Sequence, residues 1–346
     1  MKSPRLRALV LAAGFGLRLR PLTLFLPKAL LPICGRPLVT HTLQDLARIG
    51  CEGVALNLHH LPEAIPNFLG NRFGDLPLTY SLEDPIQGTL GALFPLREFL
   101  SKADLVLVVN GDTLCSWPWK TMIRKHLRSE ADVTLLLHRR PPDQRLGGPV
   151  GIDARGAVVQ LRDTEPIGEV AHRHIFAGAQ ILSPRFLSQI DQGPADIVGD
   201  LYIPLLRSSG RIQSVVTARR WHDLGTPQRY LDASLEWLRR SKFGLRQRNA
   251  VSSLADVEPS SVLSRSIIEA GAIIERDASI EGSVLMSNVR VSVGSTIRSS
   301  IIGPEVELPR AATIERRMVT RIRSGYHPNA GETVMGELVY SPLESG

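Results

Sequence analysis

The sequence predicts a chain of two parts, an α/β domain over residues 1–240 and a short parallel β-helix over residues 262–319. Strand-like apolar runs and helix-like segments alternate as far as about residue 240, which is typical of a three-layer α/β fold. Polar side chains are frequent in residues 241–261, which we expect to form a linker. Apolar side chains then recur at every sixth position, and residues 320–346 form a tail that no pattern assigns.

The α/β domain is expected to be a sheet covered by helices on both faces. Short apolar runs have the length of buried strands at Ala8–Leu11, Gly53–Asn57, Leu105–Val109, Val133–His138 and Ala179–Leu182. Apolar residues at helical spacing predict a helix over Pro37–Ile49, which would cover the sheet. A further amphipathic helix is expected from Pro227 to about Lys242.

The C-terminal part has a different periodicity. Ile268, Ile274 and Ile280 lie six residues apart, and the same step resumes at Leu285 and, after a second slip, at Leu308. A six-residue apolar period is typical of a parallel β-helix, in which each hexad forms one side of a triangular coil. A β-sandwich would instead show alternation with a period of two. We therefore predict a β-helix of about three coils.

The loop after the first strand is suited to binding a polyphosphate. Gly14 and Gly16 can adopt conformations that point consecutive backbone N–H groups at an anion. Arg18 adds a fork of hydrogen-bond donors, and Lys28 adds a compact positive charge. Two other glycine-loop motifs are excluded, because Leu19 stands where a dinucleotide fingerprint needs glycine and the G-K-[ST] of a Walker A loop does not occur.

The residues from Leu11 to Thr23, followed by Pro27 to Pro32, resemble the signature of the sugar-1-phosphate nucleotidyltransferases, L-A-A-G-x-G-x-R-L-x-P-L-T and P-K-x-L-x-P. The resemblance implies a Rossmann-like nucleotidyltransferase domain, and a short left-handed β-helix after that domain is familiar in the same family. The implied reaction joins a nucleoside triphosphate (NTP) to a sugar 1-phosphate and gives a nucleotide sugar and pyrophosphate. The chain is accordingly expected to be an enzyme.

The resemblance also implies roles for single residues. Arg18 and Lys28 match the family's catalytic basic pair, which neutralises the triphosphate and the transition state. Asp112 and Asp223 match its two metal-binding aspartates, so Mg²⁺ is the expected cofactor. No general base is required, because a phosphate monoester is already anionic at neutral pH.

The expected nucleotide-binding residues lie in two glycine-containing segments. They are Leu11, Ala12, Ala13, Gly14, Gly16, Gln87, Gly88 and Thr89. The second segment resembles the G-T-A-G-A-L of the mannose-1-phosphate guanylyltransferase branch, except that Leu90 stands where that branch usually has alanine. GTP is therefore the favoured NTP, while the other bases stay open.

The expected sugar-phosphate site departs from the family pattern. The family's E-K-P segment carries a lysine that meets the sugar phosphate, whereas the corresponding stretch here is Asp163–Pro166. Glu165 would repel a phosphate, so another cation must substitute, and Arg162 and Arg145 are the candidates. The residues expected to line this site are Gly148, Arg162, Glu165 and Gly178.

Alternatives to this enzyme stay open. The missing lysine would also suit a non-catalytic regulatory subunit that binds nucleotide sugars. A nucleotidyltransferase for another base or another phosphate, such as a cytidylyltransferase acting on a non-sugar phosphate, would share much of the pattern. An additional acyltransferase activity of the β-helix is disfavoured, because residues 262–319 contain no histidine that could act as a base.

The composition excludes several other classes of protein. Hydrophobic residues make up 43% of the chain, and no apolar run approaches the ~18 residues of a membrane span. The net charge of +7 comes with 5% aromatic residues and no basic stripe, so nucleic-acid binding is not expected. The apolar run after Arg7 is about seven residues long, short for a signal peptide, so we expect a cytoplasmic protein. We also expect a homo-oligomer.

Overall fold

The computed structural model describes residues 3–139, 148–240 and 249–344, which form two compact units. Unit 1 consists of Met1–Gly14 and Val39–Trp221, and unit 2 consists of Phe15–Leu38 and His222–Gly346. The loop that carries Arg18 and Lys28 therefore clusters with the C-terminal part of the chain rather than with the strand that precedes it. Each unit is described by itself.

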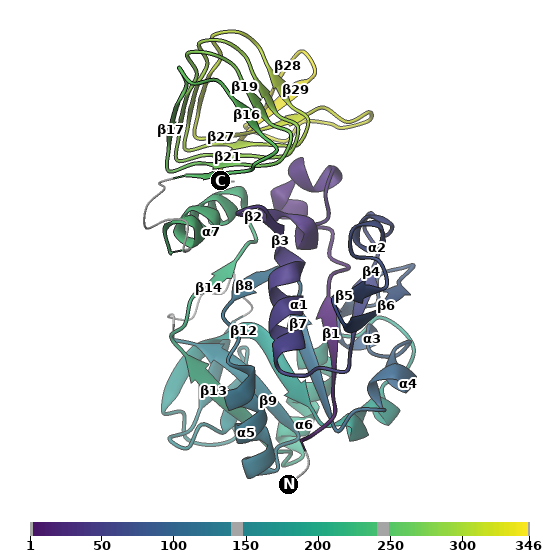
Figure 1. The fold of residues 1–346 in the computed structure, drawn as a ribbon. Coiled ribbons are helices and arrows are strands. Elements are labelled where there is room, and N and C mark those ends of the chain that lie inside the picture. The colour runs from purple at the N-terminus through teal and green to yellow at the C-terminus, as the bar shows by residue number, and fades with distance from the viewer. Residues whose placement is uncertain (1–2, 140–147, 241–248, 345–346) are drawn as a thin grey trace. The chain divides into compact units, whose positions relative to one another are not determined.

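Unit 1 is built on a mixed sheet whose centre is parallel (Figure 1). Four strands form this centre in the spatial order β7, β1, β4, β6, with bounds Leu105–Asn110, Leu6–Leu11, Gly53–Leu58 and Leu76–Leu82. The short β5 (Arg72–Phe73) pairs with β6 at one edge. The strands predicted from the first three apolar runs are confirmed, with ends that differ by one or two residues.

The other half of the sheet is organised around β12 (His172–Leu182), which runs antiparallel to β7, β9 and β10. Its neighbours have the bounds β9 Val133–His138, β13 Ile212–Thr217, β10 Pro149–Ile152 and β11 Val158–Leu161. The pairing of β12 with β9 shifts register between Phe176 and Gln180. Gly178, at φ +87°, lies inside this bulge, where a side chain would be strained.

Helices cover both faces of the sheet, as a three-layer fold requires. The longer ones are α1 (Leu38–Arg48) and α5 (Trp119–Ser129), which lie in front of the sheet in Figure 1. Shorter helical elements are α2 Ala64–Leu69, α3 Gly88–Gly91, α4 Arg97–Leu100, η5 Pro184–Gln189, η6 Ile197–Tyr202 and α6 Ile203–Arg207. Leu9 packs in one core cluster with Leu93, while its neighbours Ala8 and Val10 are buried on the opposite face.

Unit 2 contains a parallel β-helix with three faces. The first face is β15 Ala250–Val251, β18 Ile267–Ile268, β21 Val284–Leu285, β24 Ile301–Ile302 and β27 Arg317–Arg321. The second is β16 Asp256–Val257, β19 Ile273–Ile274, β22 Arg290–Val291 and β25 Glu307–Leu308. The third is β17 Val262–Ser264, β20 Ser279–Glu281, β23 Thr296–Arg298 and β26 Thr313–Glu315. Each coil stacks its buried aliphatic residues on those of the next, which confirms the predicted fold class.

The parallel pairing begins earlier than the predicted start at residue 262, since Ala250 and Val251 already pair with Ile267 and Ile268. In the C-terminal tail, β29 (Leu338–Pro342) and β28 (Thr333–Met335) extend the first face in antiparallel pairing. The predicted amphipathic helix is α7 (Pro227–Arg240). No helix in the described ranges has both the length and the apolar character to cross a membrane.

The loop segment of unit 2 is a series of tight turns. Its short helical turns are η1 Leu17–Leu19, η2 Leu22–Leu24 and η3 Lys28–Leu30, and they lead into the hairpin β2 Pro32–Ile33 and β3 Arg36–Pro37. Gly16 begins η1 at φ +61°, and its carbonyl oxygen accepts a hydrogen bond of 3.0 Å from the hydroxyl of Thr23. The glycine thus permits the left-handed turn that the loop needs here.

Candidate active site

The site in unit 1 starts at the carboxyl ends of two parallel strands. Leu11 ends β1 and pairs with Asn110, which ends β7. Gly111 follows, and its N–H donates a 2.9 Å hydrogen bond to the carbonyl oxygen of Leu11. A Cβ at Gly111 would lie 2.7 Å from that oxygen, so glycine is needed for the close approach. The turn brings Asp112 to this edge of the sheet, which is where open α/β sheets bind ligands.

A chain of polar contacts joins the two predicted nucleotide segments. The N–H of Ala12 donates to Oδ1 of Asn57 at 2.7 Å, and Nδ2 of Asn57 donates to Oε1 of Glu83 at 2.9 Å. The second oxygen of Glu83 accepts a hydrogen bond of 2.8 Å from the N–H of Gln87. Asn57 and Glu83 are 3% and 2% exposed, so these bonds lie away from water. The structure therefore places the segments around Ala12 and Gln87 beside each other.

The second nucleotide segment also packs against the chain near Asp196. A Cβ at Gly88, which has φ +74°, would lie 2.6 Å from the carbonyl oxygen of Ala195, so only glycine fits there. The hydroxyl of Thr89 donates to Oδ1 of Asp196 at 3.2 Å and accepts from the N–H of Ile197 at 2.9 Å. These contacts fix Thr89 at the start of η6.

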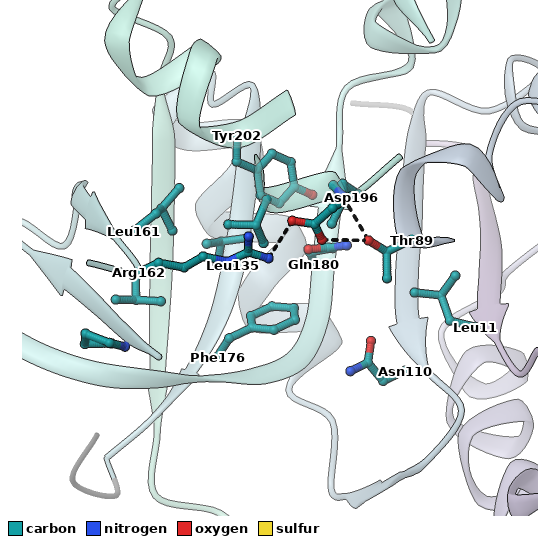
Figure 2. Close-up of a pocket in the computed structure, with 14 residues that line it drawn as sticks. Leu11, Thr89, Asn110, Leu135, Leu161, Arg162, Phe176, Gln180, Asp196 and Tyr202 are labelled. Carbon is teal, nitrogen blue, oxygen red and sulfur yellow. Dashed lines mark hydrogen bonds and ion pairs between the residues drawn. The ribbon is translucent and has the colours of Figure 1, made fainter. Parts of the chain in front are cut away.

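A cavity of about 290 Å³ lies between these segments and the far half of the sheet (Figure 2). Its apolar wall includes Leu11, Leu135, Val150, Leu161 and Phe176. Its polar groups are Thr89, Asn110, Arg162, Gln180, Asp196 and Tyr202. An apolar pocket with a few convergent polar groups is typical of a small-molecule site.

Arg162 and Asp196 form an ion pair at this cavity. A guanidinium nitrogen of Arg162 lies 2.5 Å from Oδ2 of Asp196, and both side chains remain nearly half exposed. Partial burial works to raise the pKa of Asp196, but hydrogen bonds from the N–H of Gly199 and from Arg162 hold that pKa below its usual range. Arg162 has φ +53°, a left-handed conformation directly after β11, and it lines the cavity.

The other residues predicted for the sugar phosphate lie in different surroundings. A Cβ at Gly148, at φ +81°, would be 3.6 Å from Cα of Arg162, so Gly148 adjoins the cavity-lining arginine. A Cβ at Gly178 would lie within 3.3 Å of the side chains of Asn110 and Thr113, so Gly178 lies against these two residues. Glu165 is exposed and is not among the residues that line the cavity. Arg145 lies outside the described residues.

In unit 2 the predicted basic residues gather around Asp223. Nζ of Lys28 lies 3.9 Å from Oδ1 of Asp223, and Arg229 on α7 donates to Oδ2 at 2.7 Å. A Cβ at Gly225 would lie 2.7 Å from a guanidinium nitrogen of Arg18 and 3.0 Å from Oδ2 of Asp223. Lys28 and Arg229 thus contact the Asp223 carboxylate and Arg18 lies beside Gly225, and basic groups of this kind suit a polyphosphate.

The sequence was compared with known proteins. It matches the model of the nucleotidyl transferase family over residues 7–240 and that of a GlmU-like C-terminal hexapeptide family over residues 250–324. The chain belongs to the nucleotidyl transferase family. The second match starts at residue 250, as does β15, and hexapeptide repeats of this kind are consistent with a left-handed β-helix.

Relatives of this nucleotidyltransferase include the mannose-1-phosphate guanylyltransferase of Mycobacterium tuberculosis, 32% identical over 86% of this chain and 84% of that protein. Mannose-1-phosphate guanylyltransferase 1 of Arabidopsis thaliana is 26% identical over 97% of this chain and 92% of that protein. The crystal structure of HddC from Yersinia pseudotuberculosis is similar with a TM-score of 0.56 at 24% identity, covering 67% of this chain and 99% of that chain. That likeness concerns the fold alone.

These findings confirm the family and the enzyme class that the loop signature predicts. Sequence reasoning missed several residues of the nucleotidyltransferase site. Asn57, Glu83, Asp196 and Tyr202 belong to no motif and are identified only through their contacts. Gln180 could have been identified from the sequence, because a polar residue inside the apolar strand run Ala179–Leu182 is unusual.

Proposed function

We propose that this nucleotidyltransferase transfers a guanylyl group from GTP to mannose 1-phosphate or a closely similar sugar 1-phosphate. An oxygen of the sugar phosphate attacks the α-phosphorus of GTP, the bond from that phosphorus to the bridging oxygen breaks, and pyrophosphate leaves. The products are a GDP-sugar and pyrophosphate. One observation carries the proposal: a single cavity is lined both by Leu11 and Thr89 of the nucleotide segments and by Arg162.

The choice of guanine and mannose rests on the relatives. Several proteins named as mannose-1-phosphate guanylyltransferases are similar over most of this chain. The Gln87–Thr89 segment, which resembles the same branch, is held against Ala195 and Asp196 and so can line a narrow base slot. The backbone from Leu11 to Gly14 would form the opposite side of that slot.

Charge neutralisation is the main task of the protein in such a reaction. Two anions must meet, so the barrier falls when fixed positive groups offset their repulsion. Arg18 and Lys28, with Arg229 beside them, would act on the triphosphate, and Arg162 would act on the sugar phosphate. Gly148 and Gly178 would let the sugar approach the backbone.

Mg²⁺ is part of the proposal, with Asp112 and Asp223 as its protein ligands. Carboxylate oxygens fit this cation, and Mg²⁺ usually keeps water and substrate phosphates as its remaining ligands. When bound, the ion would neutralise phosphate oxygens.

The proposed substrates also fit the remaining expectations. NTPs and sugar phosphates are cytoplasmic metabolites, and we propose that the enzyme acts there as a homo-oligomer. Sedimentation of the purified protein at several concentrations would test the oligomer, since a monomer at every concentration contradicts it.

The test mixes GTP, Mg²⁺ and a panel of sugar 1-phosphates with the enzyme and measures pyrophosphate release. We expect release with GTP and mannose 1-phosphate, and at least about a tenfold lower rate for Asp112→Asn, because that change removes a metal-binding charge. The folding of the variant is checked by its melting temperature. A variant with more than about a tenth of the wild-type kcat would show that Asp112 is not a metal ligand.

Two other results would change the proposal. Pyrophosphate release with CTP or UTP in place of GTP would assign a different base. Tight binding of GDP-mannose without release from any NTP and sugar phosphate would indicate a non-catalytic regulatory subunit.

A further inference from the structure

In the described part of the chain, two buried polar groups that line the cavity of unit 1 lack a hydrogen-bond partner. Gln180 is 3% exposed and Tyr202 is 1% exposed, and both line the cavity. Among the described residues, neither Oε1 of Gln180 nor the hydroxyl of Tyr202 has a partner. A buried polar atom that stays unsatisfied is unfavourable, so such a pair at a cavity wall indicates a ligand that supplies the missing bonds.

Rigid elements hold both side chains. Gln180 lies on β12, two residues after the bulge at Gly178, and its backbone position is fixed by pairing with β7 and β9. Tyr202 ends η6, whose first turn is capped when the N–H of Gly199 donates to Asp196. Figure 2 shows the polar ends of Gln180 and Tyr202 in the same region as the carboxylate of Asp196, with Phe176 on the opposite side.

The cavity has a charged part and an uncharged part. Arg162 and Asp196 have side chains that are 45% and 43% exposed, so they lie toward solvent. Gln180 and Tyr202 are almost fully buried, so their polar groups lie further from solvent than the ion pair. A sugar 1-phosphate would place its anionic phosphate at the exposed Arg162 and its uncharged ring against the buried pair, because an unpaired phosphate is costly to bury.

The chemistry of the pair selects a hydroxyl group. Oε1 of Gln180 can only accept a hydrogen bond, whereas the hydroxyl of Tyr202 can donate one. A sugar hydroxyl can donate to the first and accept from the second at the same time. An amide oxygen or a hydrogen atom in its place would leave at least one of the two groups without a partner.

We propose that Gln180 and Tyr202 are specificity-determining residues, which together recognise one hydroxyl of the sugar ring on the side remote from C1, at C3 or C4. This inference rests on the proposed function of the same cavity. It predicts that a sugar 1-phosphate lacking that hydroxyl is rejected, since a site built to bind a hydroxyl discriminates strongly against an analogue without it.

The experiment measures kcat/KM for mannose 1-phosphate and its 2-, 3-, 4- and 6-deoxy analogues at saturating GTP. For the wild type we expect a loss of about 100-fold or more with the 3-deoxy or the 4-deoxy analogue. Gln180→Leu and Tyr202→Phe should lower kcat/KM for mannose 1-phosphate about 10- to 100-fold and reduce the loss for that analogue to about fivefold or less. Their KM for GTP should stay within about twofold of wild type.

Gln213→Leu is the matched control. Gln213 also has a buried Oε1 without a partner among the described residues, but it lies on β13 and does not line the cavity. This variant should discriminate among the analogues as the wild type does. Melting temperatures of the two cavity variants should equal or exceed that of the wild type, because each change removes an unsatisfied group.

A binding measurement separates this inference from the proposed function. In calorimetric titration with mannose 1-phosphate, Gln180→Leu and Tyr202→Phe should bind at least about tenfold more weakly than the wild type and Gln213→Leu. If the two cavity variants bind mannose 1-phosphate more weakly but none of the four proteins releases pyrophosphate, the proposed function is contradicted. The inference that Gln180 and Tyr202 recognise the sugar would still hold. Equal binding by all four proteins, or unchanged discrimination by the two cavity variants, would overturn the inference.

Discussion

At the scale of single residues, the site depends on polar groups whose partners are distant in sequence. Arg162 is the clearest case, because the family's lysine is missing and Arg162 lines the cavity with Asp196 as its partner. The carboxylate offsets part of the charge of the arginine and fixes the guanidinium beside the cavity. A phosphate could share that guanidinium, since its remaining N–H groups are donors.

Arg162→Ala should therefore affect one substrate and not the other. We expect the KM for the sugar 1-phosphate to rise about 10- to 100-fold, as for the loss of a charge-assisted hydrogen bond, while the KM for GTP stays within about twofold. Steady-state kinetics with each substrate varied in turn gives both values. Arg211→Ala is a suitable control, since it breaks a comparably exposed ion pair, with Glu130, away from the cavity.

If Arg162→Ala changed neither value while Arg145→Ala raised the KM for the sugar phosphate, Arg145 would have the role of the missing lysine. If neither variant affected the sugar phosphate, the idea of a substituting arginine would be wrong.

A second residue predicts how stability depends on pH. His126 on α5 is 3% exposed, its Nδ1 lies 2.9 Å from the hydroxyl of Thr134, and burial lowers its pKa to about 4. The unfolded chain binds a proton near pH 6.5, whereas the folded protein does so only near pH 4. The free energy of unfolding therefore decreases as the pH falls from about 6.5 to about 4, by up to about 3 kcal/mol from this histidine.

The measurement is the free energy of unfolding from urea titrations between pH 7 and pH 4. His126→Asn should give a shallower decline than the wild type over this range, because it removes the titrating group. His172→Asn, which changes an exposed histidine, should decline as the wild type does. Parallel curves for the wild type and His126→Asn would show that His126 does not titrate differently in the folded protein.

At the scale of elements, α7 and the β-helix hold the basic loop segment in unit 2. Tyr230 of α7 donates a 2.7 Å hydrogen bond to the carbonyl oxygen of Pro32, and the N–H of Gly35 donates a 2.9 Å bond to Oε1 of Glu269. The guanidinium of Arg321 lies 5.6 Å from the centre of the Phe25 ring. The β-helix is thus a support for the loop that carries Arg18 and Lys28.

Substitutions of Glu269 would test whether the β-helix supports the loop. The direction in which the charge of Glu269 changes stability with pH follows from its pKa. Burial raises the pKa of Glu269, so the folded protein favours the protonated carboxyl and loses stability as the pH rises through the folded pKa. Glu269→Gln keeps the acceptor for Gly35 and removes the charge. Its melting temperature should exceed that of the wild type at pH 8, and the difference should vanish near pH 4.

Glu269→Ala is the contrasting variant, because it removes the acceptor of the Gly35 N–H. We expect it to be about 1 kcal/mol less stable than Glu269→Gln at pH 8. Equal stability of the two variants at that pH would show that the Gly35 bond contributes nothing.

At the scale of the whole molecule, the compact units do not follow the domains that the sequence suggests. The family match ends at residue 240, but Phe15–Leu38 and α7 cluster with the β-helix in unit 2. Residues that would act on the triphosphate therefore belong to one unit, and the cavity with Arg162 belongs to the other.

The sequence by itself determined the β-helix and the family. A six-residue apolar step reports a local backbone geometry, so Ile274 and Ile280 could be assigned to the interior without knowledge of their neighbours. The loop from Leu11 to Lys28 is likewise a continuous string, and its composition alone indicated an anion site. Within the β-helix, the parallel pairing starts at Ala250, earlier than predicted.

Only the tertiary structure decided which polar residues share the cavity. Asp196 lies 34 residues from Arg162 and 107 from Thr89, and it contacts both in the folded chain, where α3 packs against η6. The partners of Asn57 and the unsatisfied groups of Gln180 and Tyr202 depend in the same way on the order of strands. A local pattern fixes how a segment folds, but strand order and the packing of distant segments fix what each polar side chain meets.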